Sequence, residues 1–127
     1  KHNRISNPFK HLIFNIIIKK KLFSLESIHD FLKKFKKNVK LYKGFSDTEL
    51  LKIDMSKIDM VFLDGGHSYE TVKNDISIIL SGMKKGKIII CDDYDQVNYG
   101  VKKAVDEFKN QVSEIKELNK RLVRIVA

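Results

Sequence analysis

The sequence has no second cysteine and no long apolar run, and each absence excludes a class of protein. Cys91 cannot form an internal disulfide, and its place in an apolar run is typical of a reducing compartment. The longest apolar run near the start, LIFNIII at 12–18, is much shorter than the roughly 20 residues of a membrane-spanning helix. No small-residue cleavage site follows it, which argues against a secretory signal. We therefore expect a cytoplasmic protein with no membrane partner.

Proline occurs only once, as Pro8, and no linker, internal repeat or low-complexity tract divides the chain. At 127 residues, with 43% hydrophobic and 32% charged residues, the chain has the length and composition of one globular domain. Its composition is therefore neither that of a disordered protein nor that of a membrane protein.

Positive charge is concentrated in the first third of the chain. Residues 1–43 contain 12 Lys or Arg against Glu26 and Asp30, whereas residues 44–127 contain 13 against 14 acidic residues. A basic segment of this kind can bind nucleic acid by releasing counterions. A solvated, lysine-rich face is the preferred interpretation, because no nucleic-acid recognition motif accompanies the charge.

Apolar periodicity predicts three amphipathic helices and several short strands. The helices are expected at 24–38, from about Tyr69 to Ser81, and from Val101 to about Val112. Strands are expected at 39–45, at 57–64 and within 86–95, before a closing hairpin of EIKEL and RLVRIVA. This order predicts an α/β fold with a mostly parallel sheet and an antiparallel hairpin at its carboxyl end. We divide the chain into a basic segment with one helix, 1–38, and an α/β part, 39–127.

Two of the predicted strands end in carboxylates. Asp64 follows one apolar run and Asp92 and Asp93 follow the next, and parallel strands place their carboxyl ends on one rim of the sheet. Three clustered carboxylates repel one another unless a cation lies between them, and a hard divalent ion with oxygen ligands would satisfy them. Gly65 and Gly66 would let a ligand approach the backbone there. The alternative is that these residues only form a turn and an exposed loop.

The segments IDMVFLDGGHSYETVKNDI, KKGKIIICDDYD and YGVKKAVDEF, in this order, resemble the carboxyl-terminal half of class I S-adenosylmethionine-dependent methyltransferases. The likeness is greatest to the group whose fourth strand ends in D-G-x-H-S-Y-E and whose fifth strand ends in D-D-Y. It covers about residues 39–127 and implies a Rossmann-like fold, with the closing hairpin as the sixth and seventh strands.

The resemblance implies a cofactor, S-adenosylmethionine, and residues that contact it. Phe45 and Ser46 would lie near the adenine, and Asp64 and Gly65 would border both the cofactor and a small hydroxylated or sugar substrate. His67 is the candidate general base, because its unperturbed pKa is near neutrality. An equally weighted interpretation makes His67 a helix-entry residue that hydrogen-bonds to the turn.

In metal-dependent oxygen methyltransferases of similar layout, acids after the fourth and fifth strands hold a magnesium-like ion. Here the resemblance assigns that role to Asp64, Asp92 and Asp93, with Asp64 also counted among the catalytic residues. Such an ion would orient a substrate hydroxyl and lower its pKa before methyl transfer. Gly66 stands where some relatives carry a further carboxylate.

The glycine-rich loop that opens a complete enzyme of this class is missing. The first glycine is Gly44 and no G-x-G-x-x-G spacing occurs, so we expect a fragment or a degenerate remnant of the fold. Half of such a sheet would leave an apolar edge unpaired, which favours a homo-oligomer, a partner chain or residues 12–18 as its cover.

These observations leave three functional hypotheses. The leading hypothesis is an enzyme that methylates an oxygen of a small hydroxylated molecule with metal assistance. The second is a non-catalytic, methyltransferase-like binding or scaffolding module, and the third is a nucleic-acid-associated protein that uses its basic first third.

Overall fold

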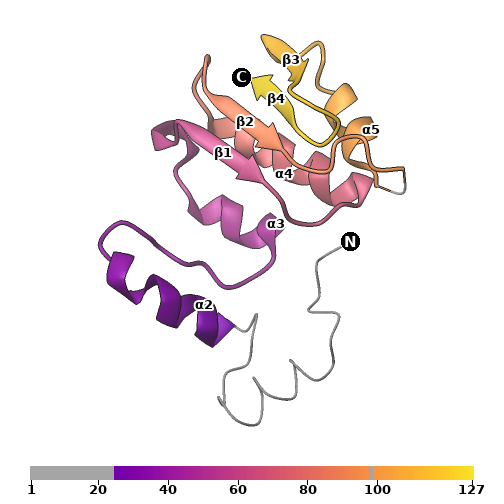
Figure 1. Ribbon diagram of the computed structural model, residues 1–127. Coiled ribbons are helices and arrows are strands. Elements are labelled where there is room, and N and C mark those ends of the chain that lie inside the picture. The colour runs from indigo at the N-terminus through magenta and orange to yellow at the C-terminus, as the bar shows by residue number, and fades with distance from the viewer. Residues whose placement is uncertain (1–24, 98) are drawn as a thin grey trace, which may run out of the picture. The chain divides into compact units, whose positions relative to one another are not determined.

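The computed structural model describes residues 25–97 and 99–127, and the chain divides between Tyr42 and Lys43 into two compact units. In the first unit, helix α2 spans Leu25–Leu32 and continues into the 3-10 helix η2 at Lys33–Phe35 (Figure 1). This confirms the central part of the helix predicted at 24–38, whereas the predicted domain boundary at residue 38 stays a prediction. Within the described ranges, no helix is both long and apolar enough to cross a membrane.

The second unit alternates helices and strands. In chain order its elements are α3 (Ser46–Glu49), η3 (Leu50–Lys52), η4 (Met55–Lys57), β1 (Met60–Leu63), α4 (Tyr69–Gly82), β2 (Ile88–Cys91), α5 (Val101–Asp106), β3 (Glu114–Glu117) and β4 (Val123–Val126). The strands form one sheet in the order β1-β2-β4-β3. β1 and β2 are parallel, and β4 runs antiparallel to both β2 and β3. The predicted α/β fold with a carboxyl-terminal antiparallel hairpin is therefore confirmed.

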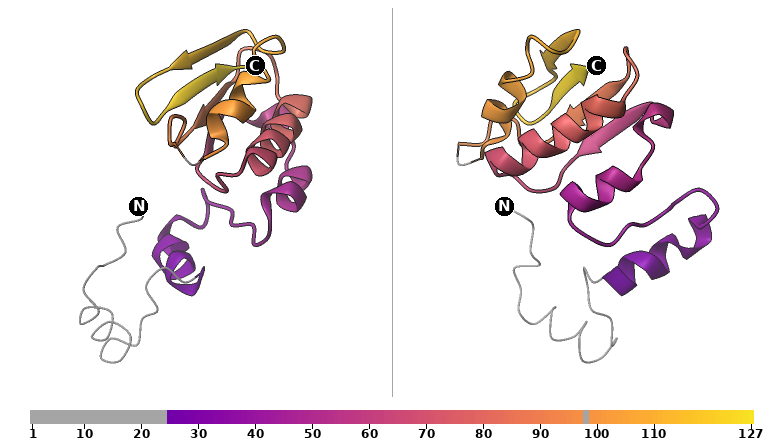
Figure 2. Two further views of the ribbon diagram at one scale, coloured as in Figure 1. Left: turned by 90° about the vertical axis from the view of Figure 1, so that its right-hand side faces the viewer. Right: turned by 180° about the vertical axis from the view of Figure 1, so that it is seen from behind.

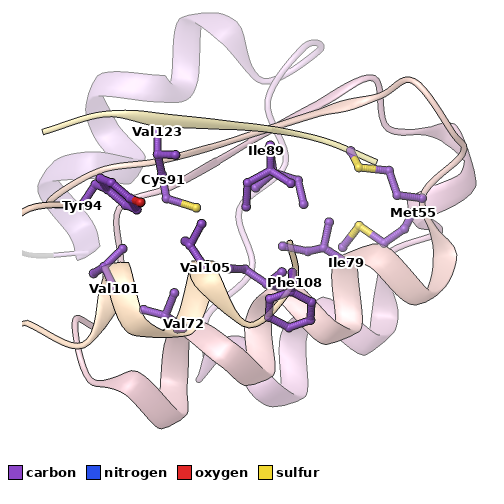
Figure 3. Close-up of a cluster of buried hydrophobic side chains, with 14 residues drawn as sticks. Met55, Val72, Ile79, Ile89, Cys91, Tyr94, Val101, Val105, Phe108 and Val123 are labelled. Carbon is purple, nitrogen blue, oxygen red and sulfur yellow. The ribbon is translucent and has the colours of Figure 1, made fainter. Parts of the chain in front are cut away.

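One face of the sheet carries the hydrophobic core. Strand side chains alternate between the two faces, so Leu63, Cys91 and Val123 lie in one cross-strand row and Val61, Ile89 and Ile125 in the next. Helices α4 and α5 cover this face, as the view from behind shows (Figure 2). Figure 3 shows the close packing that results, with Ile89, Ile79, Val105 and Phe108 among its members. Full burial of each such apolar side chain contributes roughly 1.5–3 kcal/mol.

The opposite face carries exposed apolar side chains at one edge. Met60 and Phe62 of β1 are 57% and 54% exposed, and β1 is paired on one side only within the described sheet. This edge is the part of the predicted fold at which we expected a partner.

The strand predicted at 39–45 is wrong. Residues 39–43 have no regular secondary structure, and Phe45 is already the N-cap of helix α3. Val39 donates its backbone N–H to the carbonyl of Phe35, a helix-end hydrogen bond rather than a sheet contact. Alternating side chains alone cannot form a strand, because its backbone groups need a neighbouring strand to pair with. The third predicted helix is also shorter than expected, since α5 ends at Asp106 and turns follow it.

Candidate active site

A pocket of about 290 Å³ lies in the second unit, at the carboxyl ends of β1 and β2. Its lining combines polar and apolar side chains. The lining residues are Ser46, Leu50, Phe62, Leu63, Asp64, Gly65, Gly66, His67, Val72, Asp75, Cys91, Asp92 and Val101. Five of the residues that the sequence predicts for the site, Ser46, Asp64, Gly65, His67 and Asp92, are thus brought to one pocket, at the rim where open α/β sheets bind ligands.

The turn from β1 into α4 forms one wall of this pocket. Ser68 caps the helix, because its hydroxyl oxygen accepts a hydrogen bond of 3.2 Å from the backbone N–H of Thr71. A Cβ added at Gly65 would meet no atom within 4 Å, so this glycine leaves open space beside Asp64. Positive φ occurs at neither Gly65 nor Gly66. Gly65 therefore leaves room for a ligand near the backbone, whereas a Cβ at Gly66 would lie 2.9 Å from Thr71 Cγ2, and the turn does not depend on a left-handed glycine conformation.

The acidic end of β2 is held by an arginine from the turn between β3 and β4. Arg121 donates from Nε to Asp92 Oδ1 at 3.0 Å and from a terminal nitrogen to Asp92 Oδ2 at 2.5 Å, and the same terminal nitrogen lies 3.3 Å from Asp93 Oδ1. Asp93 has a φ of 55°, in the left-handed region that aspartate adopts more readily than most residues. Tyr94, next to it, is buried, and its backbone N–H donates to the carbonyl of Arg121 at 2.8 Å.

These contacts decide the ionisation of Asp92. Burial by itself raises the pKa of Asp92, but hydrogen bonds from Arg121 and from the backbone N–H of Asp93 outweigh it, with help from the charges of Arg121 and His67. The resulting pKa lies below its ordinary value, so Asp92 is a carboxylate at neutral pH. In return, Asp92 first, then Asp93 and Asp64, raise the pKa of the Arg121 guanidinium.

The predicted magnesium ligands do not form a metal site in this arrangement. In the described part of the chain, no group of three or more His, Cys, Asp or Glu side chains could hold a metal ion. Asp92 and Asp93 share the guanidinium of Arg121, which supplies the positive charge that the sequence assigned to an ion, and Asp93 does not line the pocket. The donor set around Asp64, Asp92 and Asp93 therefore does not fit a divalent ion unless Arg121 leaves.

His67 is positioned by two neighbours. Its ring stacks on Tyr99 with 4.3 Å between centroids and 6° between planes, and its Nδ1 lies 3.5 Å from Asp93 Oδ2. A flat stack and a facing carboxylate together fix the orientation of the imidazole, as a second group orients the base in many catalytic pairs. The backbone carbonyl of His67 also accepts a hydrogen bond of 2.8 Å from the N–H of Gly100.

A family model described as a methyltransferase domain matches residues 10–94, which is more than half of the chain. The chain belongs to this methyltransferase family. No curated protein matches its sequence. The family match and the fold confirm the resemblance to class I S-adenosylmethionine-dependent methyltransferases that the two strand-end motifs carry.

A solved structure supports the fold of this methyltransferase domain. The crystal structure of a "putative rRNA-methylase" from Clostridium thermocellum superposes with a TM-score of 0.58 and 18% sequence identity. The likeness covers 84% of this chain and 69% of that chain. At this level of identity, the comparison shows the shared fold alone.

Two residues predicted near the adenine of the methyltransferase cofactor have different surroundings. Ser46 lines the pocket from the start of α3. Phe45, one residue earlier, is 84% exposed and is not part of the pocket lining. The structure thus brings Ser46 to the candidate site and leaves Phe45 in solvent.

Sequence reasoning missed four residues of this site: Arg121, Tyr99, Gly100 and Asp75. Three of them contact residues far away in the chain: Arg121 binds Asp92, and Tyr99 and Gly100 contact His67. The sequence carries no local signal for such contacts. Asp75 had a signal, because it lies at helical spacing within the apolar face formed by Val72, Ile76 and Ile79. An acid in the middle of such a face is a candidate buried functional group.

Proposed function

We propose that this chain binds S-adenosylmethionine in the pocket at the carboxyl ends of β1 and β2 and methylates an oxygen of a small hydroxylated or sugar substrate. The observation that supports this most is the convergence of Asp64, Gly65, His67 and Asp92 on one pocket in a chain of the methyltransferase family.

The residues present fit this cofactor. Asp64 and Asp92 both line the pocket, and Asp64, whose carboxylate makes no ion pair in the described part of the chain, favours a cationic ligand group. The open space at Gly65 admits a ligand close to the backbone, and the apolar part of the lining, with Leu63 and Val101, suits a flat ring. When bound, S-adenosylmethionine supplies an activated methyl group.

In the proposed reaction, His67 is the base. Its Nδ1 faces Asp93, which leaves Nε2 to take the proton of the substrate hydroxyl as the oxygen accepts the methyl group. Asp93 and Tyr99 hold the imidazole in place. The magnesium ion expected from the resemblance would have to displace Arg121 from Asp92 and Asp93, so no step of the proposed reaction uses it.

The test is a calorimetric titration of the full chain with S-adenosylhomocysteine, with and without magnesium. Micromolar binding that weakens in Asp64→Asn is the expected result, and magnesium should change neither value. A folded chain that binds no S-adenosylhomocysteine would favour the non-catalytic, methyltransferase-like module instead. If the chain binds S-adenosylhomocysteine only when magnesium is present, the result would support the metal-assisted reaction instead.

Nucleic acid is a second candidate substrate, favoured by two observations. Residues 1–43 carry 12 basic against 2 acidic residues, and the Clostridium thermocellum structure of similar fold is described as a "putative rRNA-methylase". Binding to single-stranded RNA with a steep dependence on salt would support this alternative. Absence of RNA binding at low salt would remove it.

The unpaired edge of β1 supports a further part of the proposal, a second copy of the chain or a partner at this edge. Met60 and Phe62 expose apolar surface beside backbone groups that have no strand partner in the described sheet. Sedimentation of the wild-type chain should then show a dimer that Met60→Lys dissociates. A monomer at all concentrations would contradict this.

A further inference from the structure

The first unit exposes apolar side chains and has no core of its own in its described part. None of residues 26–42 is buried. Ile28, Phe31 and Phe35 are all exposed, Phe31 to 67%, and their spacing of three and four residues places them on one face of α2 and η2. Large apolar side chains that gather on one exposed face are typical of an interaction site.

Lysines accompany this apolar face. The Nζ of Lys34 lies 5.4 Å from the ring centroid of Phe31 and 4.9 Å from that of Phe35, so the two rings are neighbours and share one ammonium group. Residues 26–42 contain two acids, Glu26 and Asp30, against five exposed lysines: Lys33, Lys34, Lys36, Lys37 and Lys40. Of these lysines, Lys33 forms an ion pair of 2.6 Å with Asp30. The remaining excess of positive charge favours an anionic partner.

A groove of about 310 Å³ in the same segment has both an apolar and a basic lining. Leu32, Val39 and Leu41 form the apolar part. The other lining residues are His29, Lys33, Lys36 and Lys40. A partner that matches both parts of the lining combines anionic groups with apolar surface, as a phospholipid of net negative charge does.

We propose that residues 26–42 dock on the surface of a membrane that contains anionic phospholipids. The lysines meet the lipid phosphates, and the apolar face enters the boundary between headgroups and acyl chains, where amphipathic helices of this kind lie. The long lysine stems let the ammonium groups stay in the headgroup layer while the rings of Phe31 and Phe35 go deeper. This docking needs no membrane-spanning helix, and it revises the expectation of a chain without a membrane partner.

Single-stranded RNA is the other polyanion that suits a lysine-rich segment, and the contacts favour it less. RNA bases stack on open aromatic faces. Lys34 already lies over the neighbouring phenylalanine rings, and Lys40 lies over Tyr42 with 4.8 Å to the ring centroid. Much of the exposed apolar surface is also aliphatic, which suits acyl chains and offers no ring to a base: Ile28, Val39 and Leu41.

The test is cosedimentation of the full chain with vesicles, either of phosphatidylcholine alone or of equal parts phosphatidylcholine and phosphatidylserine. The wild type should bind the anionic vesicles at least about tenfold more tightly, and added salt should weaken this binding. Phe31→Ser should weaken it about tenfold, because a large apolar side chain no longer enters the bilayer. A double variant, Lys36→Gln with Lys37→Gln, should weaken it by a similar factor.

Matched controls make the same kinds of change in the second unit. Leu118→Ser removes an exposed apolar side chain, and Lys84→Gln with Lys85→Gln removes two exposed lysines. Both controls should bind the anionic vesicles as the wild type does. Equal weakening in the controls and in the variants of the first unit would overturn the assignment to residues 26–42.

A second measurement separates docking on a membrane from packing inside the chain. Because Phe31 is exposed, Phe31→Ser should melt at the same temperature as the wild type. A markedly lower melting temperature for Phe31→Ser, together with a wild type that ignores anionic vesicles, would show that the apolar face is covered by another part of the protein. That result would overturn the proposal.

The remaining outcomes also decide the proposal. A folded wild type that binds single-stranded RNA and no anionic vesicles would assign the lysines to nucleic acid and overturn membrane docking. Vesicle binding that neither Phe31→Ser nor the double lysine variant weakens would place the membrane contact elsewhere in the chain. The vesicle assay requires no cofactor, so its result is independent of the proposed methyl transfer.

Discussion

The ends of β1 and β2 look alike in the sequence and differ in the structure. Asp64, at the end of β1, is exposed, and in the described part of the chain its side chain makes no hydrogen bond or ion pair. Asp92, at the end of β2, has a side chain that is only 10% exposed. Its carboxylate accepts hydrogen bonds from Nε and from a terminal nitrogen of Arg121.

The difference separates two roles for the same strand-end acid. Asp64 keeps its lone pairs for a ligand, beside the space left by Gly65. Asp92 uses its oxygens to fix the turn at Arg121 and, through Asp93, the orientation of His67. An acid at the end of a parallel strand is therefore a candidate ligand-binding group only where no basic side chain from elsewhere in the fold already occupies it.

The largest expected effect comes from a substitution at Gly100, where the segment after β2 packs closely against the start of α4. A Cβ at this residue would lie 2.2 Å from the backbone nitrogen of Tyr69, so Gly100→Ala must displace the start of α4. We expect a loss of about 3 kcal/mol in the free energy of unfolding, measured with urea. Gly65→Ala, which meets no atom within 4 Å, is the control and should change stability by less than about 1 kcal/mol. Similar losses in both variants would contradict the close approach at Gly100.

The next effect tests the fixed end of β2. Asp92→Ala removes the partner of a bidentate arginine and should cost about 1–2 kcal/mol of unfolding free energy. Arg121→Ala should lower stability as well, because it leaves Asp92 and Asp93 without their shared cation. Arg121→Ala should also acquire affinity for Mn²⁺ that the wild type lacks, measured by calorimetry. Equal Mn²⁺ binding by the wild type would show that the guanidinium does not block the ion.

At the end of β1 we expect a substitution to weaken ligand binding and to leave stability nearly unchanged. Because Asp64 is exposed and makes no contact that holds the fold, Asp64→Asn should change the free energy of unfolding by no more than about 0.5 kcal/mol. Its affinity for S-adenosylhomocysteine should fall about tenfold. A loss of stability without a loss of binding would reverse the roles assigned to the two strand ends.

The smallest effect is a difference in acid sensitivity. The pKa of Asp92 is lowered in the folded chain, so its stabilisation is complete above the ordinary value of 3.8 and is lost as pH falls through the folded value. Asp92→Asn should therefore flatten the decline of stability below that pH. Asp75 has a raised pKa, so its contribution is most favourable at low pH and decreases as pH rises. Asp75→Asn should accordingly stabilise the chain more at neutral pH than in acid, as urea unfolding at several pH values would show.

Local patterns predicted much of the second unit and part of the site. The apolar runs around Phe62 and Ile89 form the two parallel strands, as predicted. The predicted helix after Ser68 is α4, and Ser68 is its N-cap. The pattern at 39–45 failed because a strand depends on a partner as well as on its own side chains. Asp64, Gly65 and His67 line the pocket, since each follows closely after the end of β1, and their functional roles stay predictions.

The sequence by itself determined the family, the order of the elements from β1 onward and the acids at the two strand ends, because these depend on residues close together in the chain. The tertiary structure decided that Arg121 neutralises Asp92 and Asp93, that Tyr99 stacks on His67, and that Asp75 is buried with an unpaired oxygen. The physical reason is that charge, stacking and burial depend on which groups meet in space. These contacts result from the packing of α4, α5 and the β3–β4 turn against one sheet.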